Sequence, residues 1–166
     1  IRKFGFLKII KSSSIYKNSH IQNLGPEPLS RNFNISYFNN YILGKKIKIK
    51  DLLMNQKFVA GLGNIYCNEV LFLSQIKPTR LVKNIKMKET LKLLNNTKRI
   101  LLKSIKNGGA SIKDFSSIDG VNGKFQEMFS VYGRERYRCK QKNCSGVIKK
   151  TYISKRSSFF CPMCQI

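Results

Sequence analysis

The chain has 166 residues, of which 42% are hydrophobic, so it can form one ordinary domain or two small ones, and wholesale disorder is excluded. Its 32 Lys and Arg residues against 8 Asp and Glu residues give a formal net charge of +24. No apolar run approaches the ~20 residues that span a bilayer, which excludes an integral membrane protein. The charge calls for a polyanionic partner, with nucleic acid as the first candidate and an anionic membrane surface as the second.

The amino-acid composition offers a second source for the charge. Ile, Lys and Asn fill more than a third of the positions, and A+T-rich codons specify these residue types. We therefore assign only part of the lysine excess to function.

Two prolines and a glycine in Leu24–Leu29 mark a boundary in the chain. The preceding residues, 1–24, are expected to include extended segments. From residue 32 to about residue 107 the apolar residues recur at helical spacings of three and four. The sequence therefore predicts a helical domain over residues 25–118.

Several helices are predicted inside this domain. One short helix carries Leu52 and Phe58 and is halted by the glycines of Gly61–Gly63. The next helix starts at Asn64. The segment Met87–Ile105 has an apolar stripe and ends at two consecutive glycines, which predicts a long amphipathic helix.

Residues 119–166 are typical of a small β-rich module that holds a metal. Cys139 and Cys144 form one close pair, and after sixteen intervening residues Cys161 and Cys164 form a second. This spacing is that of a four-cysteine zinc site, in which four thiolates close the coordination sphere and make the metal structural. Two disulfides are the alternative, and the absence of an export signal favours reduced thiols.

Two further candidates receive structural interpretations. Cys67 lies outside the cluster on a predicted helix and is interpreted as a small buried apolar residue. His20 is the only histidine in the chain. A structural or solvent-exposed role is therefore favoured for it over catalysis.

The turn in Lys57–Tyr66 joins two short helices through two glycines. Glycine permits a positive φ and the close approach of another backbone. The first amides of the second helix lack partners and carry the positive end of the helix dipole, which makes a phosphate site. Asn64 stands at this helix start either as an N-cap or as a phosphate contact, and the local sequence leaves both interpretations open.

The segment V-A-G-L-G-N-I-Y-C-N-E-V-L-F resembles the helix-two-turn-helix signature of formamidopyrimidine-DNA glycosylase. Other segments agree with the family in order and spacing over essentially the whole chain: R-K-F-G, L-G-P-E-P-L, N-G-G-A-S-I-K-D-F followed by D-G-V-N-G-K-F, and V-Y-G-R leading into a zinc module that ends R-S-S-F-F-C-P-M-C-Q. The resemblance implies a mainly α fold with a small β zinc module. A helix-two-turn-helix domain would be followed by a C-terminal four-cysteine zinc finger and preceded by the remnant of a β-sandwich domain in residues 1–24.

The resemblance also implies a set of DNA-binding residues. The residues that match Asn64 and Arg156 bind the DNA backbone beside the damaged nucleotide, the second of them from the zinc-finger tip. The residue that matches Lys50 also faces DNA. Arg2 and Phe4 match the arginine and phenylalanine that enter the duplex, where the phenylalanine wedges between bases and the arginine pairs with the base left without a partner.

Two parts of the family pattern differ here. The stretch Ile118–Phe125 resembles the loop that closes over the extruded lesion, but Lys124 stands where an aromatic residue is common. The family's nucleophile is an N-terminal proline amine followed by a glutamate, whereas this chain starts with Ile1 and has its first proline at Pro26. We therefore expect the C-terminal portion of such an enzyme, with no catalytic residue and no activity of its own.

The expected function follows from the resemblance. It is the DNA-binding part of a base-excision-repair glycosylase and apurinic-site lyase that removes oxidised purines such as 8-oxoguanine and formamidopyrimidines. The expected partner is double-stranded damaged DNA, with one structural Zn²⁺, no membrane partner, a monomeric state, and a place in the bacterial cytoplasm at the nucleoid. Alternatives are a non-catalytic module for damaged DNA, an endonuclease VIII-like fragment, and an RNA-binding protein.

Overall fold

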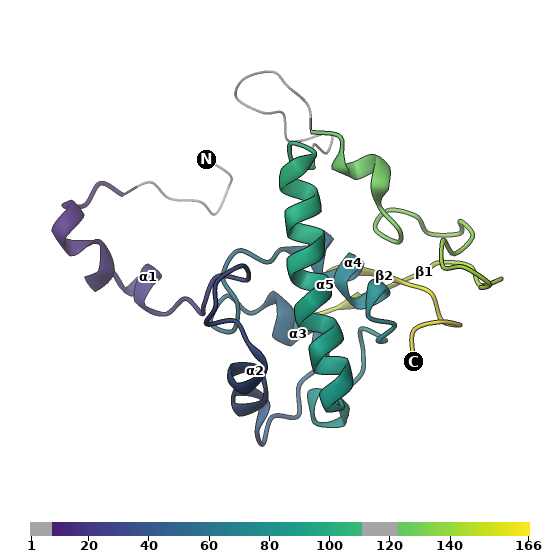
Figure 1. The fold of residues 1–166 in the computed structure, drawn as a ribbon, viewed down its shortest axis with the longest axis horizontal. Coiled ribbons are helices and arrows are strands. Elements are labelled where there is room, and N and C mark those ends of the chain that lie inside the picture. The colour runs from purple at the N-terminus through teal and green to yellow at the C-terminus, as the bar shows by residue number, and fades with distance from the viewer. Residues whose placement is uncertain (1–7, 111–122) are drawn as a thin grey trace.

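The fold is known from a computed structural model, which describes residues 8–110 and 123–166. Figure 1 shows a long helix, α5, in front of shorter helices and a two-stranded hairpin. The α-helices and strands of the described residues are α1 (Ser19–Gln22), α2 (Ile35–Ile42), α3 (Ile49–Met54), α4 (Asn64–Leu73), α5 (Met87–Lys106), β1 (Lys149–Ile153) and β2 (Arg156–Phe160). The short 3-10 helices are η1 (Ser12–Lys17), η2 (Val82–Asn84) and η3 (Phe125–Met128). This is the predicted mainly α fold with a small β module.

Helix α5 matches the predicted segment to within one residue because its pattern is strongly amphipathic. Leu93, Thr97 and Ile100 lie among its buried residues. At its start the Glu89 carboxylate accepts the N–H of Lys86 at 2.8 Å, which satisfies one of the amides without an intrahelical partner. None of the helices in the described part of the chain is long and apolar enough to cross a bilayer.

Helix α4 lies between α5 and the hairpin, and this placement joins the helical domain to the zinc module. The Tyr66 hydroxyl and the Ser104 hydroxyl of α5 are 2.7 Å apart. On the other side the Asn68 carboxamide oxygen accepts the N–H of Phe159 in β2 at 2.8 Å. The side chains of Tyr66 and Asn68 point in opposite directions because two residues turn a helix by about 200°.

Helix α3 is shorter than the sequence suggested, since it ends at Met54 and not near the glycine turn. The Asn55 side-chain oxygen accepts the N–H of Lys57 at 3.0 Å. Such local side-chain bonds compete with the helix and end it. Phe58 then enters the core from a turn, and the centroid of its ring lies 5.2 Å from that of Phe38.

The proline-rich boundary segment packs against this turn. The N–H of Gly25 donates to the carbonyl of Gln56 at 2.8 Å. A Cβ at Gly25 would lie 2.5 Å from the carbonyl carbon of Phe58, so only glycine permits this approach. The boundary segment is therefore part of the helical domain's packing.

The described part of the predicted β-sandwich remnant, residues 8–24, has the form of η1 and α1 and contains no strand. A strand needs a neighbour to accept its backbone hydrogen bonds, and the described residues offer none to this segment. Its side chains are largely exposed, with Ile9 94% and Tyr16 81% accessible.

The zinc module is built on an antiparallel hairpin. β1 pairs with β2 in a register that runs from Lys149 opposite Phe160 to Ile153 opposite Arg156. Ser154 and Lys155 form the connecting turn with φ values of 48° and 62°, as two-residue hairpin turns require.

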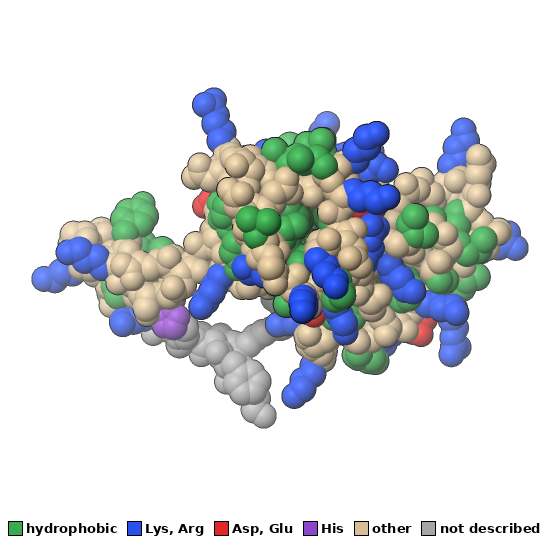
Figure 2. All heavy atoms as spheres, turned by 90° about the horizontal axis from the view of Figure 1, so that it is seen from below, with side chains coloured by type: hydrophobic (Ala, Val, Ile, Leu, Met, Phe, Trp, Pro, Cys, Tyr) green, Lys and Arg blue, Asp and Glu red, His purple; other side chains and the backbone are tan. Residues whose placement is uncertain are grey.

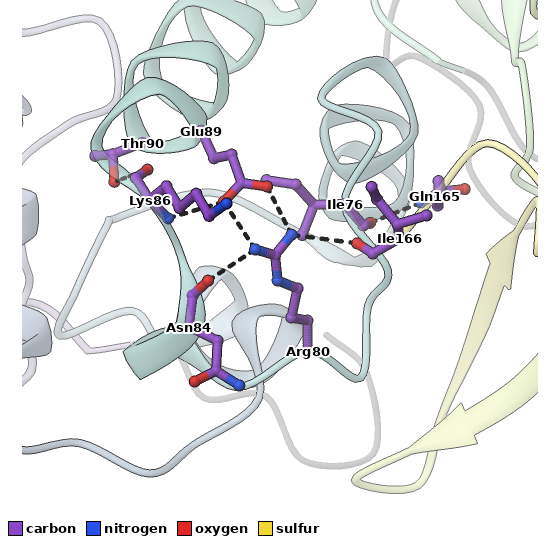
Figure 3. A network of polar contacts seen from close by, with 8 residues as sticks. All are labelled: Ile76, Arg80, Asn84, Lys86, Glu89, Thr90, Gln165 and Ile166. Atoms are coloured by element: carbon purple, nitrogen blue, oxygen red, sulfur yellow. Dashed lines mark hydrogen bonds and ion pairs between the residues drawn. The ribbon is translucent and has the colours of Figure 1, made fainter.

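The last residues of the described chain are tied to the helical domain (Figure 3). The Arg80 guanidinium makes two contacts of 2.6 and 2.9 Å with the Glu89 carboxylate and also donates to the carbonyl of Asn84. The Gln165 amide donates to the carbonyl of Ile76 at 2.8 Å, and Ile166 accepts from Arg80 at 3.3 Å. The C-terminal end of the zinc module is thus fixed on the helical domain, in addition to the hydrogen bond between Asn68 and Phe159.

Candidate nucleic-acid interface and metal centre

The four predicted cysteines converge. The Sγ atoms of Cys139, Cys144, Cys161 and Cys164 all lie within 4.8 Å of one another. The closest pairs, Cys139 with Cys164 and Cys144 with Cys161, are each 3.7 Å apart. Sulfurs at the corners of a tetrahedron about 2.3 Å from a zinc ion are about 3.8 Å apart. The donor set therefore fits a metal ion in tetrahedral thiolate coordination.

The thiols need a cation to ionise together. Burial raises the pKa of the Cys139 thiol to about 11. At Cys161 burial also acts upward, but the N–H groups of Cys164 and Met163 outweigh it and lower the pKa. A bound metal would deprotonate all four thiols, since metal ligation and proton release are coupled.

A single backbone carbonyl joins three elements of the candidate nucleic-acid interface. The Ser157 carbonyl, at the second position of β2, accepts a hydrogen bond from the Lys50 ammonium at 2.8 Å and another from the Asn64 carboxamide at 3.1 Å. Lys50 belongs to α3 and Asn64 to α4. The start of α4 is therefore held against the tip of the zinc hairpin, where Arg156 is exposed.

Lys50 is 1% exposed and its ammonium group contacts protein oxygens. Its second acceptor is the Ser158 hydroxyl at 2.6 Å. Burial lowers the pKa of Lys50 to about 8, with the neighbouring Arg156 charge acting in the same direction. In this structure the lysine thus ties α3 to the part of the hairpin that directly follows Arg156.

Asn64 is the first residue of α4 and is not its N-cap. The cap position is Gly63, which supplies no side-chain acceptor, so the N-cap interpretation of Asn64 is wrong. The first amides of α4 therefore have no side chain to satisfy them, as a helix N-terminus that receives an anion requires.

Two residues that the sequence interpretation missed hold the interface in place. The buried Glu69 carboxylate accepts the backbone N–H groups of Ser130, Val131 and Tyr132 at 2.8–2.9 Å. Asn68 binds the N–H of Phe159 from the same helix. Glu69 is the single charged residue of α4, and this is the sequence signal that could have pointed to a buried partner.

The remaining candidates divide into described and undescribed residues. Arg2, Phe4 and residues 111–122 of the lesion-loop region lie outside the described residues. Lys124 is exposed and forms an isolated bridge with Ala110. Cys67 is fully buried as predicted, and burial raises the pKa of its thiol to about 12. His20 is exposed in α1, away from the cysteine cluster.

A family model described as "Formamidopyrimidine-DNA glycosylase H2TH domain" matches residues 24–116. The chain belongs to the formamidopyrimidine-DNA glycosylase family. Among curated family members, the formamidopyrimidine-DNA glycosylase of Hydrogenovibrio crunogenus is 40% identical over 164 residues, covering 99% of this chain and 58% of the relative. That of Zymomonas mobilis is 38% identical, with 99% and 60% covered. The chain thus spans less than two thirds of the length of these relatives.

Solved structures of the family agree with the fold. The MutM (Fpg) protein of Thermus thermophilus has a TM-score of 0.84 and 32% identity, covering 91% of this chain and 57% of that one. A complex of Lactococcus lactis Fpg with DNA containing an abasic site has a TM-score of 0.85 and 34% identity, covering 94% and 56%. The family's helix-two-turn-helix architecture is thus the architecture of this chain.

Proposed function

We propose that this chain is the DNA-binding part of a DNA glycosylase and apurinic-site lyase that removes oxidised purines from damaged double-stranded DNA. The observation that carries the proposal is the Ser157 junction, which brings the start of α4 and the exposed Arg156 to one place. The Lactococcus lactis relatives were solved with DNA that contains an abasic site or Fapy-dG. The Fapy-dG ligand supports an oxidised purine as the substrate class.

The interface has the chemistry of a phosphate site. The uncapped amides of α4 present partial positive charge at Asn64, and the Arg156 guanidinium offers a full positive charge beside them. The Lys50 ammonium adds positive potential and holds the hairpin against α3. We propose that a backbone phosphate next to the lesion lies between Asn64 and Arg156.

Base extrusion requires further contacts. Flipping a base costs a few kcal/mol, and an apolar wedge with a charged donor offsets part of this cost. We assign these roles to Phe4 and Arg2, on the family resemblance alone.

The metal is proposed to be one structural Zn²⁺ held by Cys139, Cys144, Cys161 and Cys164. Four thiolates leave no position open for a water molecule, so the ion supplies folding free energy and no catalytic chemistry. A metal-binding free energy on the order of 10 kcal/mol is typical for such sites. Metal binding would stabilise the β1–β2 hairpin and thereby hold Arg156 in place.

Phosphate binding is tested with a duplex that carries a stable abasic-site analogue, titrated at several salt concentrations. Asn64→Ala and Arg156→Ala should each weaken binding and reduce the slope of log K against log salt by about 0.9, the value for one phosphate. Arg156→Lys should keep the slope. The control Lys83→Ala removes an exposed charge in η2 and should leave both the affinity and the slope near the wild-type values. Unchanged slopes for both alanine variants would remove these residues from the interface.

The assignment of catalysis is tested separately. We propose that this chain alone does not cleave DNA, because it contains no counterpart of the family's proline amine and glutamate. Incubation with an 8-oxoguanine duplex and borohydride should trap no covalent complex, whereas a full-length relative serves as the positive control. A trapped complex would show a nucleophile within these residues.

A further inference from the structure

The outer face of α5 carries a stripe of positive charge that the proposed interface does not use. Five cationic residues of this helix fall within an arc of about 60°, because residues of a helix advance by about 100° each. All five are exposed: Lys88, Lys92, Arg99, Lys103 and Lys106. The stripe is about 27 Å long at 1.5 Å per residue.

No acidic residue interrupts the stripe. The single acidic residue of α5, Glu89, lies outside this arc, about 40° beyond its edge, and is paired with Arg80. Like charges four residues apart, as in Lys88 with Lys92 and Arg99 with Lys103, oppose helix formation. The stripe therefore acts against the stability of its own helix. Lysines and arginines also dominate the charged surface in Figure 2, where acidic side chains are few.

The positive surface continues from α5 onto the segment that leads into the zinc module. Arg99 and Lys103 line a hollow of about 70 Å³ together with Ser130. Lys140 lies in the same segment, where its ammonium group donates to the carbonyl of Phe129 at 2.8 Å.

This surface lies on a different side of the molecule from the Ser157 junction. Glu69 and Leu73 of α4 line the hollow, whereas Asn64 of the same helix faces the hairpin. Asn64 and Leu73 are nine residues apart, which places them about 180° apart around the helix. A duplex bound at the junction would thus leave the α5 stripe uncovered.

We propose that the α5 stripe, with Arg99 and Lys103 at its centre, is a second DNA-binding face that holds another segment of duplex while the first lies at the Ser157 junction. The inference rests on the proposed function, because DNA held at the junction supplies further duplex at high local concentration. A linear array of cations about 27 Å long matches nearly one turn of a duplex, about 34 Å, and contacts its phosphates without reading sequence. Two such faces let the protein pass between DNA segments without full dissociation.

The test is a bridging assay with the zinc-loaded chain. An immobilised duplex with an abasic-site analogue is loaded with protein, washed, and offered a fluorescent undamaged duplex. The wild-type protein should retain the second duplex. The triple variant Lys92→Gln, Arg99→Gln, Lys103→Gln should retain at least about tenfold less while binding the immobilised duplex almost unchanged.

A matched control removes the same charge elsewhere. Lys8→Gln, Lys11→Gln, Lys17→Gln also removes three exposed positive charges, from the N-terminal segment. This variant should bridge like the wild type. Equal loss in both triple variants would make net charge the cause and overturn the inference, as would preferential capture of RNA or polyglutamate over duplex DNA. A wild-type protein that fails to bind the immobilised duplex would instead refute the proposed function.

Discussion

Substitution of Glu69 should loosen the zinc module from the helical domain. The side chain is 2% exposed and accepts three backbone N–H groups, from Ser130, Val131 and Tyr132. In Glu69→Gln the amide nitrogen replaces one acceptor oxygen, so at least one N–H loses its partner and faces another donor. A hydrogen bond to a charged group contributes about 1.5–3 kcal/mol, and a buried unsatisfied donor costs about 1–3 kcal/mol.

We therefore expect Glu69→Gln to lower the free energy of unfolding by about 2 kcal/mol. For a chain of this length that corresponds to a fall in Tm of about 4–8 °C. Glu69→Ala leaves all three N–H groups without an acceptor and should cost at least about 3 kcal/mol. Affinity for the abasic-site duplex should fall as well, because Glu69 anchors the chain segment that leads to the zinc ligands.

Urea and thermal unfolding of zinc-loaded protein measure the change. Glu127→Gln is the matched control, since Glu127 is an exposed carboxylate in η3, and it should remain within about 0.5 kcal/mol of the wild type. A Glu69→Gln protein as stable as this control would refute the view that the carboxylate holds the module in place.

Three further outcomes are expected. Cys161→Ser should release the metal and unfold the β1–β2 hairpin, whereas Cys67→Ser should retain one zinc per chain by metal analysis; a metal-bound Cys161→Ser protein would argue against the four-thiolate site. Gly146→Ala should weaken zinc affinity in a chelator competition, because its Cβ would lie 2.6 Å from the Cys161 sulfur, while Gly63→Ala, with open space around its Cβ, should bind zinc normally. Lys50→Met should flatten the pH dependence of stability measured from about pH 7.5 to about pH 9. The folded pKa of Lys50 is about 8 against 10.5 for an ordinary lysine, so the unfolded chain binds more protons in this range and wild-type stability rises with pH. An equal rise in the variant would exclude Lys50 as its source.

The local elements were predictable where the pattern is strong. The apolar stripe of Met87–Ile105 predicts α5 closely, because a 20-residue amphipathic helix leaves little choice of face. The end of α3 was not predictable from periodicity. The N–H of Lys57 donates to the Asn55 side chain, and the helix ends at Met54, four residues before Phe58.

The metal ligands were predictable because cysteine spacing reflects coordination geometry directly. The residues that assemble the interface were harder to find, since Glu69 and Asn68 bind backbone N–H groups 61–91 residues away. A backbone N–H has no signature in the sequence. The family resemblance implied that Lys50 faces DNA, while in the structure its ammonium group donates to protein oxygens on the hairpin.

The acceptor at the centre of the interface is a main-chain oxygen, which every amino acid possesses. Position 157 should therefore tolerate many side chains, whereas a residue inserted into or deleted from the turn at Ser154 and Lys155 would carry the carbonyl away from Lys50 and Asn64. The contact responds to the length of the hairpin and not to its composition. Across related chains, the interval from Lys149, where β1 begins, to Ser157 should consequently vary less than the residues that fill it.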